Sequence, residues 1–595
     1  MPLSSSFQKM LGKNKQNDQA GAISGETTPR NNASVVAKDP AVAEKADVDN
    51  SKVRIFTVRV FVMALIVSIG GLIFGYDTGQ ISGFLEMDDF KNRFGENGAF
   101  SNVRSGTIVG LLSIGTLIGA IGSAPIADKF GRKICIITWN IVFIIGVIIQ
   151  ISTTRHWYQV AIGRWVAGLG VGGLSVLTPM YQSETAPRQV RGALVSCYQL
   201  FITAGIWLAY VINFGTHNLG GPQQWRIPMG IGFIFPAIMA IGIFFLRESP
   251  RWDYRNNHIE RARATIAKSY GVPINHWEVN REMRDIKAKF EAETAGGGKP
   301  KWYECFTGPR MGYRTALGVT MQALQQLTGA NFFFYYGTTV FANIGLSDSF
   351  VTSIILGSIN FGMTFPGLYV VEHFGRRRAL MTGALWMFMC FMVFASVGHF
   401  LLQQGVQIHT AGTVMIIFAA LFIAGYAMTW GPIVWAVIGE LFPTRYRATC
   451  MGLSSASNWI WNFLISFFTP FITAAIDYRY GYIFAACSFA AVFVVYFFLC
   501  ESSGRSLEEI DTMYIMRVKP WQSSKWEPPE EEISTDALYL EPGARNIRKA
   551  NAAGMENAHG VEDVPPPTEQ HGIHDVSGTD YEAEASGVRQ GSIVR

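Results

Sequence analysis

Charged residues are scarce in this chain, and that shortage narrows the classes of protein to which it can belong. Of its 595 residues only 16% are charged, while 49% are hydrophobic; soluble domains carry roughly 25% charged residues. The formal net charge of +5 is small, and the basic residues fall in short clusters beside apolar runs. This pattern indicates membrane topology and not nucleic-acid binding. Apolar runs of about 20 residues recur through the middle of the chain and predict a protein that crosses a membrane many times.

Cysteine is also rare, and no CxxC pair or His/Cys cluster is present among the seven cysteines. They fall in apolar runs or in loops that we place inside the cell, so disulfides and structural metal are not expected. We find no nucleotide-binding loop and no nucleophile constellation, so the chain is not expected to be an enzyme or to need a cofactor. The polar first fifty residues lack the apolar core of a secretory signal, so the first span should act as the targeting signal.

What the chain does have is a series of apolar helices. We predict an all-α membrane protein whose twelve spans cover about 57–81, 104–124, 133–152, 157–179, 192–213, 227–246, 313–341, 350–372, 379–400, 413–438, 449–476 and 480–500.

The polar segments divide these spans into domains. Two six-helix bundles are expected over 53–249 and 311–514, joined by a charged segment of helical periodicity at 250–310. Residues 1–52 and 515–595 have low-complexity composition and are predicted to be disordered tails. Asn32 fits the glycosylation pattern, but it would lie in the cytoplasm and stay unmodified.

Orientation is predicted from the basic residues of the short loops, because these concentrate on the cytoplasmic side. They follow spans 2, 4, 8 and 10, and comprise Lys129, Arg132, Lys133, Arg188, Arg191, Arg376, Arg377, Arg378, Arg445 and Arg447. Both termini and the 250–310 linker are therefore expected in the cytoplasm.

An internal repeat supports the division into two halves. The segment Asp-Lys-Phe-Gly-Arg-Lys at 128–133 is similar to Glu-His-Phe-Gly-Arg-Arg at 372–377, and 184–191 is similar to 440–447 in the same way. The repeated segments lie at matching loops of the two halves. Duplicated bundles with a site at their interface are typical of transporters that work by alternating access.

One polar stretch interrupts the apolar pattern: Gln325-Gln326-Leu327-Thr328-Gly329-Ala330-Asn331, followed by the aromatic run 332–336. Unpaired amides in hydrocarbon cost several kcal/mol, so these side chains should face a protected cavity. A straight helix would place Asn331 about 140° away from Gln326, whereas a break at Gly329 would let both converge on a ligand. The alternative is that the amides join neighbouring helices and the aromatic side chains face lipid.

Several motifs together resemble one family. They are Gly71-Leu72-Ile73-Phe74-Gly75-Tyr76-Asp77, Gly163-Arg164, the two repeated loops, Arg247-Glu248-Ser249-Pro250-Arg251, the Gln325 stretch, and Gly431-Pro432-Ile433-Val434-Trp435. In this order, over about 55–515, the set resembles the sugar porters of the major facilitator superfamily and most closely the fungal monosaccharide transporters. The resemblance implies the major facilitator fold, with cytoplasmic helices in the linker.

The resemblance also implies a hexose site. The family's sugar contacts match Gln325, Gln326, Asn331, Asn360, Trp435 and Asn458 in the second half, and Gln199 in the first. An isolated membrane glutamine such as Gln199 can equally join two helices. Asn462 is the i, i+4 partner of Asn458 and shares its helical face. Tyr335 and Tyr336 resemble the outer-gate aromatics of the family.

Asp77 and Arg164 raise the question of proton coupling. A carboxylate within a span costs roughly 2.5–3.5 kcal/mol and should have a partner or a function, and Arg164 is the arginine placed to be that partner. In proton-coupled relatives the matching aspartate is protonated from outside, which loosens its hold on the arginine. Some fungal facilitators keep the same aspartate, so facilitated diffusion stays open.

A third set of charges forms the expected cytoplasmic gate: Arg132, Glu184, Arg191, Glu248, Arg251, Arg376, Glu440 and Arg447. Orientation alone would need only the basic members. In the family, such groups form ion pairs that close the cytoplasmic side. The chain departs from the family at Val434, where proline is usual, and at Cys500-Glu501-Ser502-Ser503-Gly504, which lacks the usual proline and lysine.

We therefore expect a multi-pass plasma-membrane transporter that moves glucose or a similar monosaccharide with H⁺ through the lipid bilayer. The alternatives are a facilitative hexose uniporter and a glucose sensor that signals through its long C-terminal tail. The two terminal tails are also candidate binding segments for regulatory partners.

Overall fold

The computed structural model describes residues 57–187, 190–295, 303–342, 349–402, 408–443, 446–505 and 507–527. These residues belong to a unit that ends at Trp526, and the described part of this unit is helical, with no β-strand. The predicted N-terminal tail, Asn32, and the loop residues Arg188 and Arg445 lie outside the described residues.

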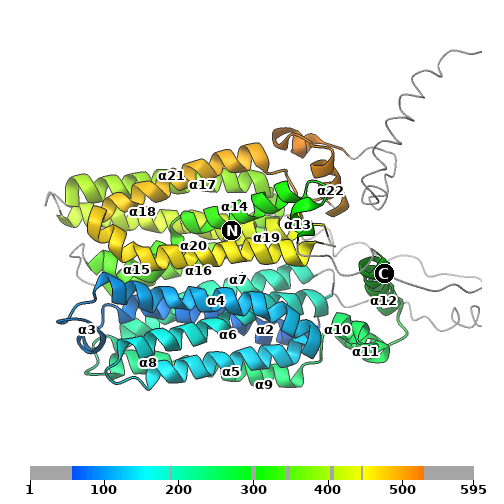
Figure 1. Ribbon diagram of the computed structural model, residues 1–595, viewed down its shortest axis with the longest axis horizontal. Coiled ribbons are helices and arrows are strands. Elements are labelled where there is room, and N and C mark those ends of the chain that lie inside the picture. The colour runs from blue at the N-terminus through cyan, green and yellow to red at the C-terminus, as the bar shows by residue number, and fades with distance from the viewer. Residues whose placement is uncertain are drawn as a thin grey trace, which may run out of the picture. The chain divides into compact units, whose positions relative to one another are not determined.

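The first bundle contains the helices drawn in blue to blue-green in Figure 1. They are α2 (Val58–Phe84), α4 (Asn102–Phe130), α5 (Arg132–Ile151), α6 (Trp157–Thr185), α7 (Arg191–Thr216), α8 (Gln223–Ile231) and α9 (Ile234–Phe245), with the short α3 (Asp88–Phe94) after α2. Glycine allows α4 and α6 to approach closely: a Cβ on Gly119 would lie 2.1 Å from the backbone oxygen of Leu169. Small residues at helix contacts are the usual means of close packing in membranes.

The second bundle is drawn in green to orange (Figure 1). It contains α14 (Met311–Leu327), α15 (Ala330–Ala342), α16 (Ser349–His373), α17 (Arg376–Val397) with a π-helical turn at Gly398–Leu402, α18 (Ile408–Met428), α19 (Trp430–Leu441), α20 (Arg447–Ile476), a 3₁₀ turn at Asp477–Arg479, and α21 (Tyr480–Phe498).

The remaining helices lie at one end of the bundles, on the right in Figure 1, which we call the linker end. They are α10 (Pro250–Arg255), α11 (Ile259–Tyr270), α12 (Trp277–Ala295), α13 (Glu304–Thr307), α22 (Leu507–Ile515) and a 3₁₀ turn at Pro520–Lys525. Ala262, Ile266 and Tyr270 of α11 form a small core with Val279 and Met283 of α12. The expected helical linker is thus present in the described part of 250–310.

The C-terminal end of the packed unit differs from the prediction. The sequence places the start of a disordered tail at residue 515, but ordered backbone continues through the turn at Pro520–Lys525. Arg314 anchors this region. Its Nε donates to the backbone oxygen of Leu441 at 2.7 Å, and its Nη1 pairs with Asp511 of α22. The low-complexity composition predicted a tail in this region. It could not predict the buried contacts of Arg314 with Leu441 and Asp511 that precede the tail.

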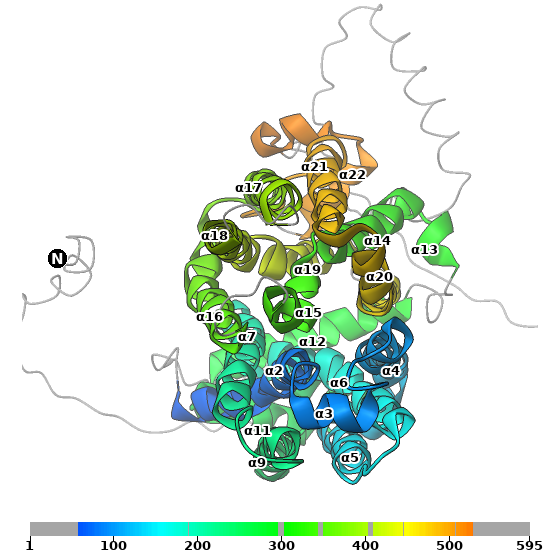
Figure 2. The same cartoon turned by 90° about the vertical axis from the view of Figure 1, so that its left-hand side faces the viewer.

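The two bundles meet along three helix pairs: α4 with α20, α7 with α16, and α2 with α15. Figure 2 looks onto the end opposite the linker end, and there α2 and α15 lie next to each other between the bundles. The hydroxyls of Ser82 and Thr338 are 3.0 Å apart, and Tyr210 Oη donates to the backbone oxygen of Phe334 at 3.1 Å. These bonds join the bundles at the opposite end.

Ten helices of the described chain are long and apolar enough to cross a membrane, judged by length and composition. One of them, Thr449–Phe498, contains both α20 and α21, and the broken pair α14–α15 is not among the ten. The count of twelve spans therefore stays a prediction.

Candidate functional site

The helix break that the sequence predicts is present at Gly329. Helix α14 ends at Leu327 and α15 begins at Ala330, and Gly329 adopts a φ of +88°, in the left-handed region. A Cβ at this position would lie 2.6 Å from the Phe484 ring. Thr328 Oγ1 bonds back to the backbone oxygen of Gln325 at 2.7 Å, which closes the end of α14.

This break brings together two of the predicted amides, because the Asn331 side chain donates to Gln326 Oε1. Gln326 Nε2 in turn donates to Asn458 Oδ1 of α20 at 3.0 Å. Asn458 Nδ2 lies 2.8 Å from Gln325 Oε1 and 2.5 Å from Gln322 Oε1. Four predicted residues are therefore joined in one hydrogen-bonded cluster, which we call the amide cluster.

Gln325 also connects the cluster to α19. Its Nε2 donates to the backbone oxygens of Trp430 and Gly431 at 2.9 and 3.0 Å. Trp430 and Gly431 lie at the start of α19, where Pro432 is tolerated because the first turn of a helix has no partner for its backbone nitrogen. The cluster thus spans α14, α15, α19 and α20 of the second bundle.

Asn462 extends the amide cluster to the first bundle. Its Oδ1 accepts from Ser113 Oγ of α4 at 2.5 Å and from Tyr335 Oη at 3.2 Å. Its Nδ2 lies 3.3 Å from Gln326 Oε1. The i, i+4 spacing from Asn458 had identified the shared face but not these partners. Nothing in the sequence marked Ser113, whereas Gln322 could have been found from its i, i+3 spacing to Gln325.

Three predicted contact residues stay outside the cluster. Gln199 is half-buried on α7 and Asn360 is buried on α16, and no hydrogen bond among the described residues links either side chain to the amide cluster. Trp435 is 37% exposed on α19, and no hydrogen bond among the described residues links it to the amide cluster. Their roles remain predictions.

The two tyrosines of the aromatic run are buried and bonded to α20. Tyr335 reaches Asn462, as described, and Tyr336 Oη donates to the backbone oxygen of Ser466 at 2.6 Å. Both tyrosines follow the break, on the part of the chain that meets α2 at the opposite end. In this position they cover the amide cluster from that end.

Asp77 and Arg164 face each other in the interior of the first bundle, and both are fully buried. Arg164 Nη1 lies 3.6 Å from Asp77 Oδ2, and Gln80 Nε2 donates to Asp77 Oδ1 at 3.1 Å. Among the described residues, no hydrogen-bond partner reaches any of the three guanidinium nitrogens of Arg164. The carboxylate of Asp77 is thus the group in the described structure that compensates this buried cation.

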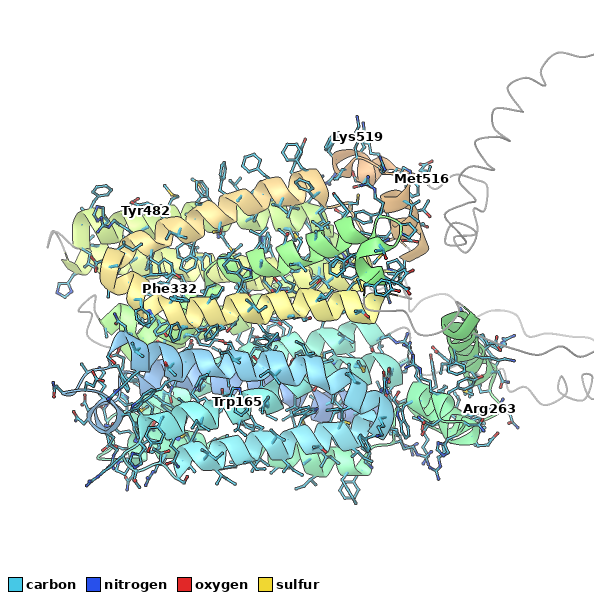
Figure 3. All side chains as sticks on the ribbon, viewed as in Figure 1. Trp165, Arg263, Phe332, Tyr482, Met516 and Lys519 are labelled. Carbon is cyan, nitrogen blue, oxygen red and sulfur yellow. The ribbon has the colours of Figure 1, made fainter. Side chains whose placement is uncertain are left out.

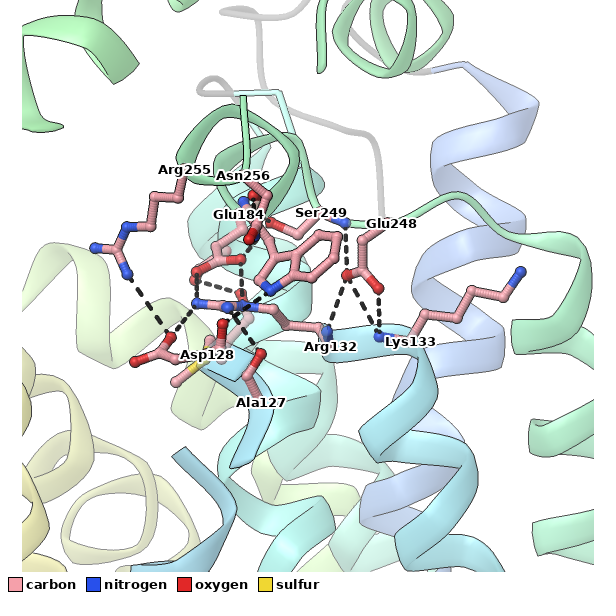
Figure 4. Close-up of polar contacts among 12 residues, drawn as sticks. Ala127, Asp128, Arg132, Lys133, Glu184, Glu248, Ser249, Arg255 and Asn256 are labelled. Atoms are coloured by element: carbon pink, nitrogen blue, oxygen red, sulfur yellow. Dashed lines mark hydrogen bonds and ion pairs between the residues drawn. The ribbon is translucent and has the colours of Figure 1, made fainter. Parts of the chain in front are cut away.

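The charges at the linker end of the first bundle form a compact network (Figure 4). Arg132 Nε and Nη2 donate to the two oxygens of Glu184 at 3.0 and 3.2 Å. Glu248 accepts from the backbone nitrogens of Arg132 and Lys133 at 2.9 and 3.0 Å. Burial raises the pKa of Glu248, and these N–H groups partly offset that increase. Ser249 donates to Glu184 and completes the network.

The second bundle repeats this arrangement. Arg376 Nη2 donates to Glu440 at 3.1 Å, and Glu501 accepts from the backbone nitrogens of Arg376 and Arg377 at 2.8 and 3.2 Å. Ser502 Oγ donates to Glu440 at 2.7 Å. The repeat seen in the sequence is therefore also a repeat of contacts, and the loop that lacks the family's proline and lysine still makes them.

The other predicted gate residues lie at the same end. Arg191 Nη2 is 3.8 Å from Glu282 of α12 and bonds to the backbone oxygen of Ala186 at 3.2 Å. Arg447 caps the backbone oxygen of Phe442 at 3.2 Å, and Arg251 is half-buried on α10. The ion pairs Arg132–Glu184 and Arg376–Glu440 each lie within one bundle.

Comparison with known proteins identifies relatives of this chain. The family model described as "Sugar (and other) transporter" matches residues 63–514. A low-affinity glucose transporter of Kluyveromyces lactis is 48% identical over 489 residues, 80% of this chain and 86% of that protein. A high-affinity fructose transporter of Schizosaccharomyces pombe is 42% identical, over 81% of this chain and 92% of its own.

A solved structure agrees at the level of the fold. The proton:xylose symporter XylE of E. coli, bound to 6-bromo-6-deoxy-D-glucose, matches with a TM-score of 0.65 and 26% identity. The match covers 76% of this chain and 99% of that structure. With the broken helix, the paired bundles and the repeated charge networks described above, these comparisons show that the chain belongs to the sugar transporter family and has the major facilitator fold.

Proposed function

We propose that this chain carries glucose-type hexoses across the plasma membrane by alternating access and that a proton moves with the sugar. The amide cluster is the observation that carries this proposal. Its side chains can each donate and accept, which suits a neutral ligand rich in hydroxyl groups. The hexose transporters among its relatives, and the sugar-bound symporter of the same fold, support the same substrate class.

Sugar binding in this cluster is an exchange of hydrogen bonds. Hydroxyl groups of the hexose replace amide–amide bonds such as Gln326–Asn458. A sugar that lacks one hydroxyl leaves a buried amide unpaired, at a cost of roughly 1–3 kcal/mol. Gln199, Asn360 and Trp435 are proposed to complete the site when the bundles close around the sugar.

Asp77 is proposed to couple the sugar to a proton. A buried charge that loses its partner is strongly unfavourable, and protonation of Asp77 would leave the Arg164 guanidinium uncompensated. Arg164 would then have to move toward other acceptors, so protonation favours a rearrangement of α2 and α6. The proton is released again when the carboxylate and the guanidinium pair.

The two ends of the bundles are proposed to open in turn. The linker end lies in the cytoplasm, as its basic residues indicate, and both termini lie on that side. The opposite end is held by contacts of α2 with α15, with Tyr335 and Tyr336 as the outer gate. The inner gate is proposed to form when the linker-end charges of the two bundles, Arg132 and Glu184 with Arg376 and Glu440, meet across the bundles, whereas in this conformation each pair lies within one bundle.

Uptake measurements test this proposal. The chain is expressed in cells that lack hexose carriers, and labelled glucose uptake is measured with and without a proton uncoupler. We expect concentrative uptake that the uncoupler abolishes, and Asp77→Asn should leave at most uptake that equilibrates. Uptake that never concentrates and ignores both pH and Asp77→Asn would contradict coupling and favour a facilitator. Absence of uptake at normal surface expression would contradict transport and favour a sensor.

A further inference from the structure

The segment 515–526 after α22 carries an unusual set of side chains for a connection into a tail. It contains Arg517, Lys519 and Lys525 and no acidic residue. All three basic side chains are exposed, together with Met516 and Trp521, which are 52% and 43% exposed. Figure 3 shows Met516 and Lys519 pointing outward at the linker end, away from the helices of the second bundle. We call these five side chains the basic–aromatic patch.

The patch continues the outer surface of α21. The Trp521 ring stacks on Tyr496, with ring centroids 6.2 Å apart and an interplanar angle of 11°, and meets the edge of Phe497. Tyr496, Phe497 and, farther along the helix, Phe493 are all exposed on this membrane-spanning helix. Apolar side chains exposed on a span face lipid, so Trp521 lies where the lipid-facing surface ends and the polar headgroups begin.

Hydrogen bonds hold the segment in this place. Ser523 Oγ donates to the backbone oxygen of Pro520 at 2.6 Å and accepts from the backbone nitrogen of Glu501 at 2.8 Å. Arg505 Nη2 donates to the backbone oxygens of Ser523 and Trp526 at 2.9 and 2.7 Å. The patch is therefore a surface with a defined backbone.

The backbone conformation of Arg517 is a second unusual feature of this segment. It adopts a φ of +58° at the end of α22, a position where glycine is normally preferred because it has no Cβ. The chain has a long basic side chain at this strained position. Arg517 is two residues from Lys519, whose Nζ lies 5.9 Å from the centre of the Trp521 ring.

We propose that the basic–aromatic patch binds anionic phospholipids of the leaflet at the linker end. Trp521 and Met516 enter the interface between headgroups and acyl chains, and Arg517, Lys519 and Lys525 contact the negative headgroups. The assignment to the cytoplasmic leaflet, where anionic lipids concentrate, rests on the proposed orientation. Because Glu501 bonds both to Ser523 and to the start of α17, bound lipid also steadies the linker end of the second bundle.

Lipid retention by the purified full-length protein tests this proposal without a transport assay. The protein in detergent is incubated with phosphatidylserine or phosphatidylcholine, and bound lipids are counted by native mass spectrometry. The test variant is Arg517→Gln/Lys519→Gln/Lys525→Gln. Its matched control, Arg261→Gln/Arg284→Gln/Lys287→Gln, removes three exposed charges from α11 and α12. We expect the test variant to bind phosphatidylserine at least about tenfold more weakly, since each basic residue near an anionic surface contributes about fivefold.

Further variants separate charge from backbone effects. Arg517→Lys/Lys519→Arg/Lys525→Arg should retain phosphatidylserine, whereas Arg517→Gly relieves the backbone strain and should still weaken retention. Equal loss of phosphatidylserine in the test and control variants would overturn the proposal.

Hydrogen exchange of 515–526 in nanodiscs gives an independent result. We expect slower exchange when phosphatidylserine is added to phosphatidylcholine. The main competing occupant is the acidic stretch Glu530-Glu531-Glu532 of the same chain. Protection that does not depend on phosphatidylserine, and that disappears when residues 528–595 are deleted, would assign the patch to that stretch and overturn lipid binding.

Discussion

Gln325, Gln326, Asn331 and Asn458 are each bonded to another protein group, so a sugar bound at the proposed site would replace existing hydrogen bonds. Gln326 illustrates this: its Nε2 serves Asn458 while its Oε1 serves Asn331 and Asn462. Net hydrogen-bond energies are small because one bond is exchanged for another. We therefore expect a moderate affinity at the proposed site, which a transporter needs to release its cargo.

Gln325 is the cluster member with the clearest expected effect. Gln325→Ala removes one polar contact that we propose for the sugar and should raise the apparent KM for glucose about tenfold, equivalent to one lost hydrogen bond. Uptake kinetics at matched surface expression measure this change. The control is Gln150→Ala, which removes a buried membrane amide of α5 that donates to the backbone oxygen of Gly146 and should leave the KM unchanged. A normal KM in Gln325→Ala would show that the sugar site lies elsewhere.

At the scale of the element, Gly329 is the position on which the broken helix depends. Gly329→Ala forces a Cβ into the left-handed region, at about 1–2 kcal/mol, and against the Phe484 ring. We expect a lower thermal unfolding temperature in detergent and weaker sugar binding, because Asn331 would no longer meet Gln326. Gly337→Ala is the matched control, since a Cβ there meets nothing within 4 Å. Equal stability of the two variants would contradict the role of the break.

A buried ion pair joins helix α22 to the second bundle, together with the buried side chains of Ile510, Met513 and Tyr514. The side chains of Arg314 and Asp511 are only 1% and 6% exposed. Removing one partner of such a pair typically costs about 3–5 kcal/mol, because the other charge stays buried. Asp511→Ala should therefore destabilise the protein strongly in thermal unfolding.

The comparison variant for that measurement is Glu291→Ala. It breaks the Lys287–Glu291 pair, in which both side chains are 62% exposed, and exposed pairs contribute about 0–1 kcal/mol. If Asp511→Ala were no more harmful than Glu291→Ala, the Arg314 contact would not anchor α22.

The predictability of these elements follows from the range of the interactions. The break at Gly329 and the convergence of Gln326 with Asn331 could be predicted, since glycine and helical spacing are local features. The Ser113–Asn462 bond and the Arg314–Asp511 pair could not, because they join residues that lie far apart in the chain. Asn360 and Gln199 were selected from the family resemblance, and this conformation leaves both outside the amide cluster.

At the scale of the whole molecule, the two bundles carry the same charge network at the linker end. Glu184 and Glu440 receive equivalent arginines, and Glu248 and Glu501 cap equivalent helix starts. The repeated sequence predicted equivalent positions, but the resemblance had suggested pairs that close the gate. Here the two arginine–glutamate pairs, Arg132–Glu184 and Arg376–Glu440, lie within single bundles, so each bundle keeps its own linker end rigid.

The self-bonded amide cluster has a consequence for carrier kinetics. Because Gln325, Gln326, Asn331 and Asn458 are already bonded to protein groups, the unloaded protein bears only a small penalty for an empty site in this conformation. The unloaded carrier should then be able to change between its two open conformations. The protein should therefore sustain net flux and should not be restricted to exchanging one sugar for another. We expect unlabelled glucose preloaded inside proteoliposomes to accelerate labelled glucose uptake less than about threefold, since the four bonded amides stabilise the unloaded form. Acceleration of tenfold or more would contradict this expectation, because it would show that the conformational change of the empty carrier limits the rate.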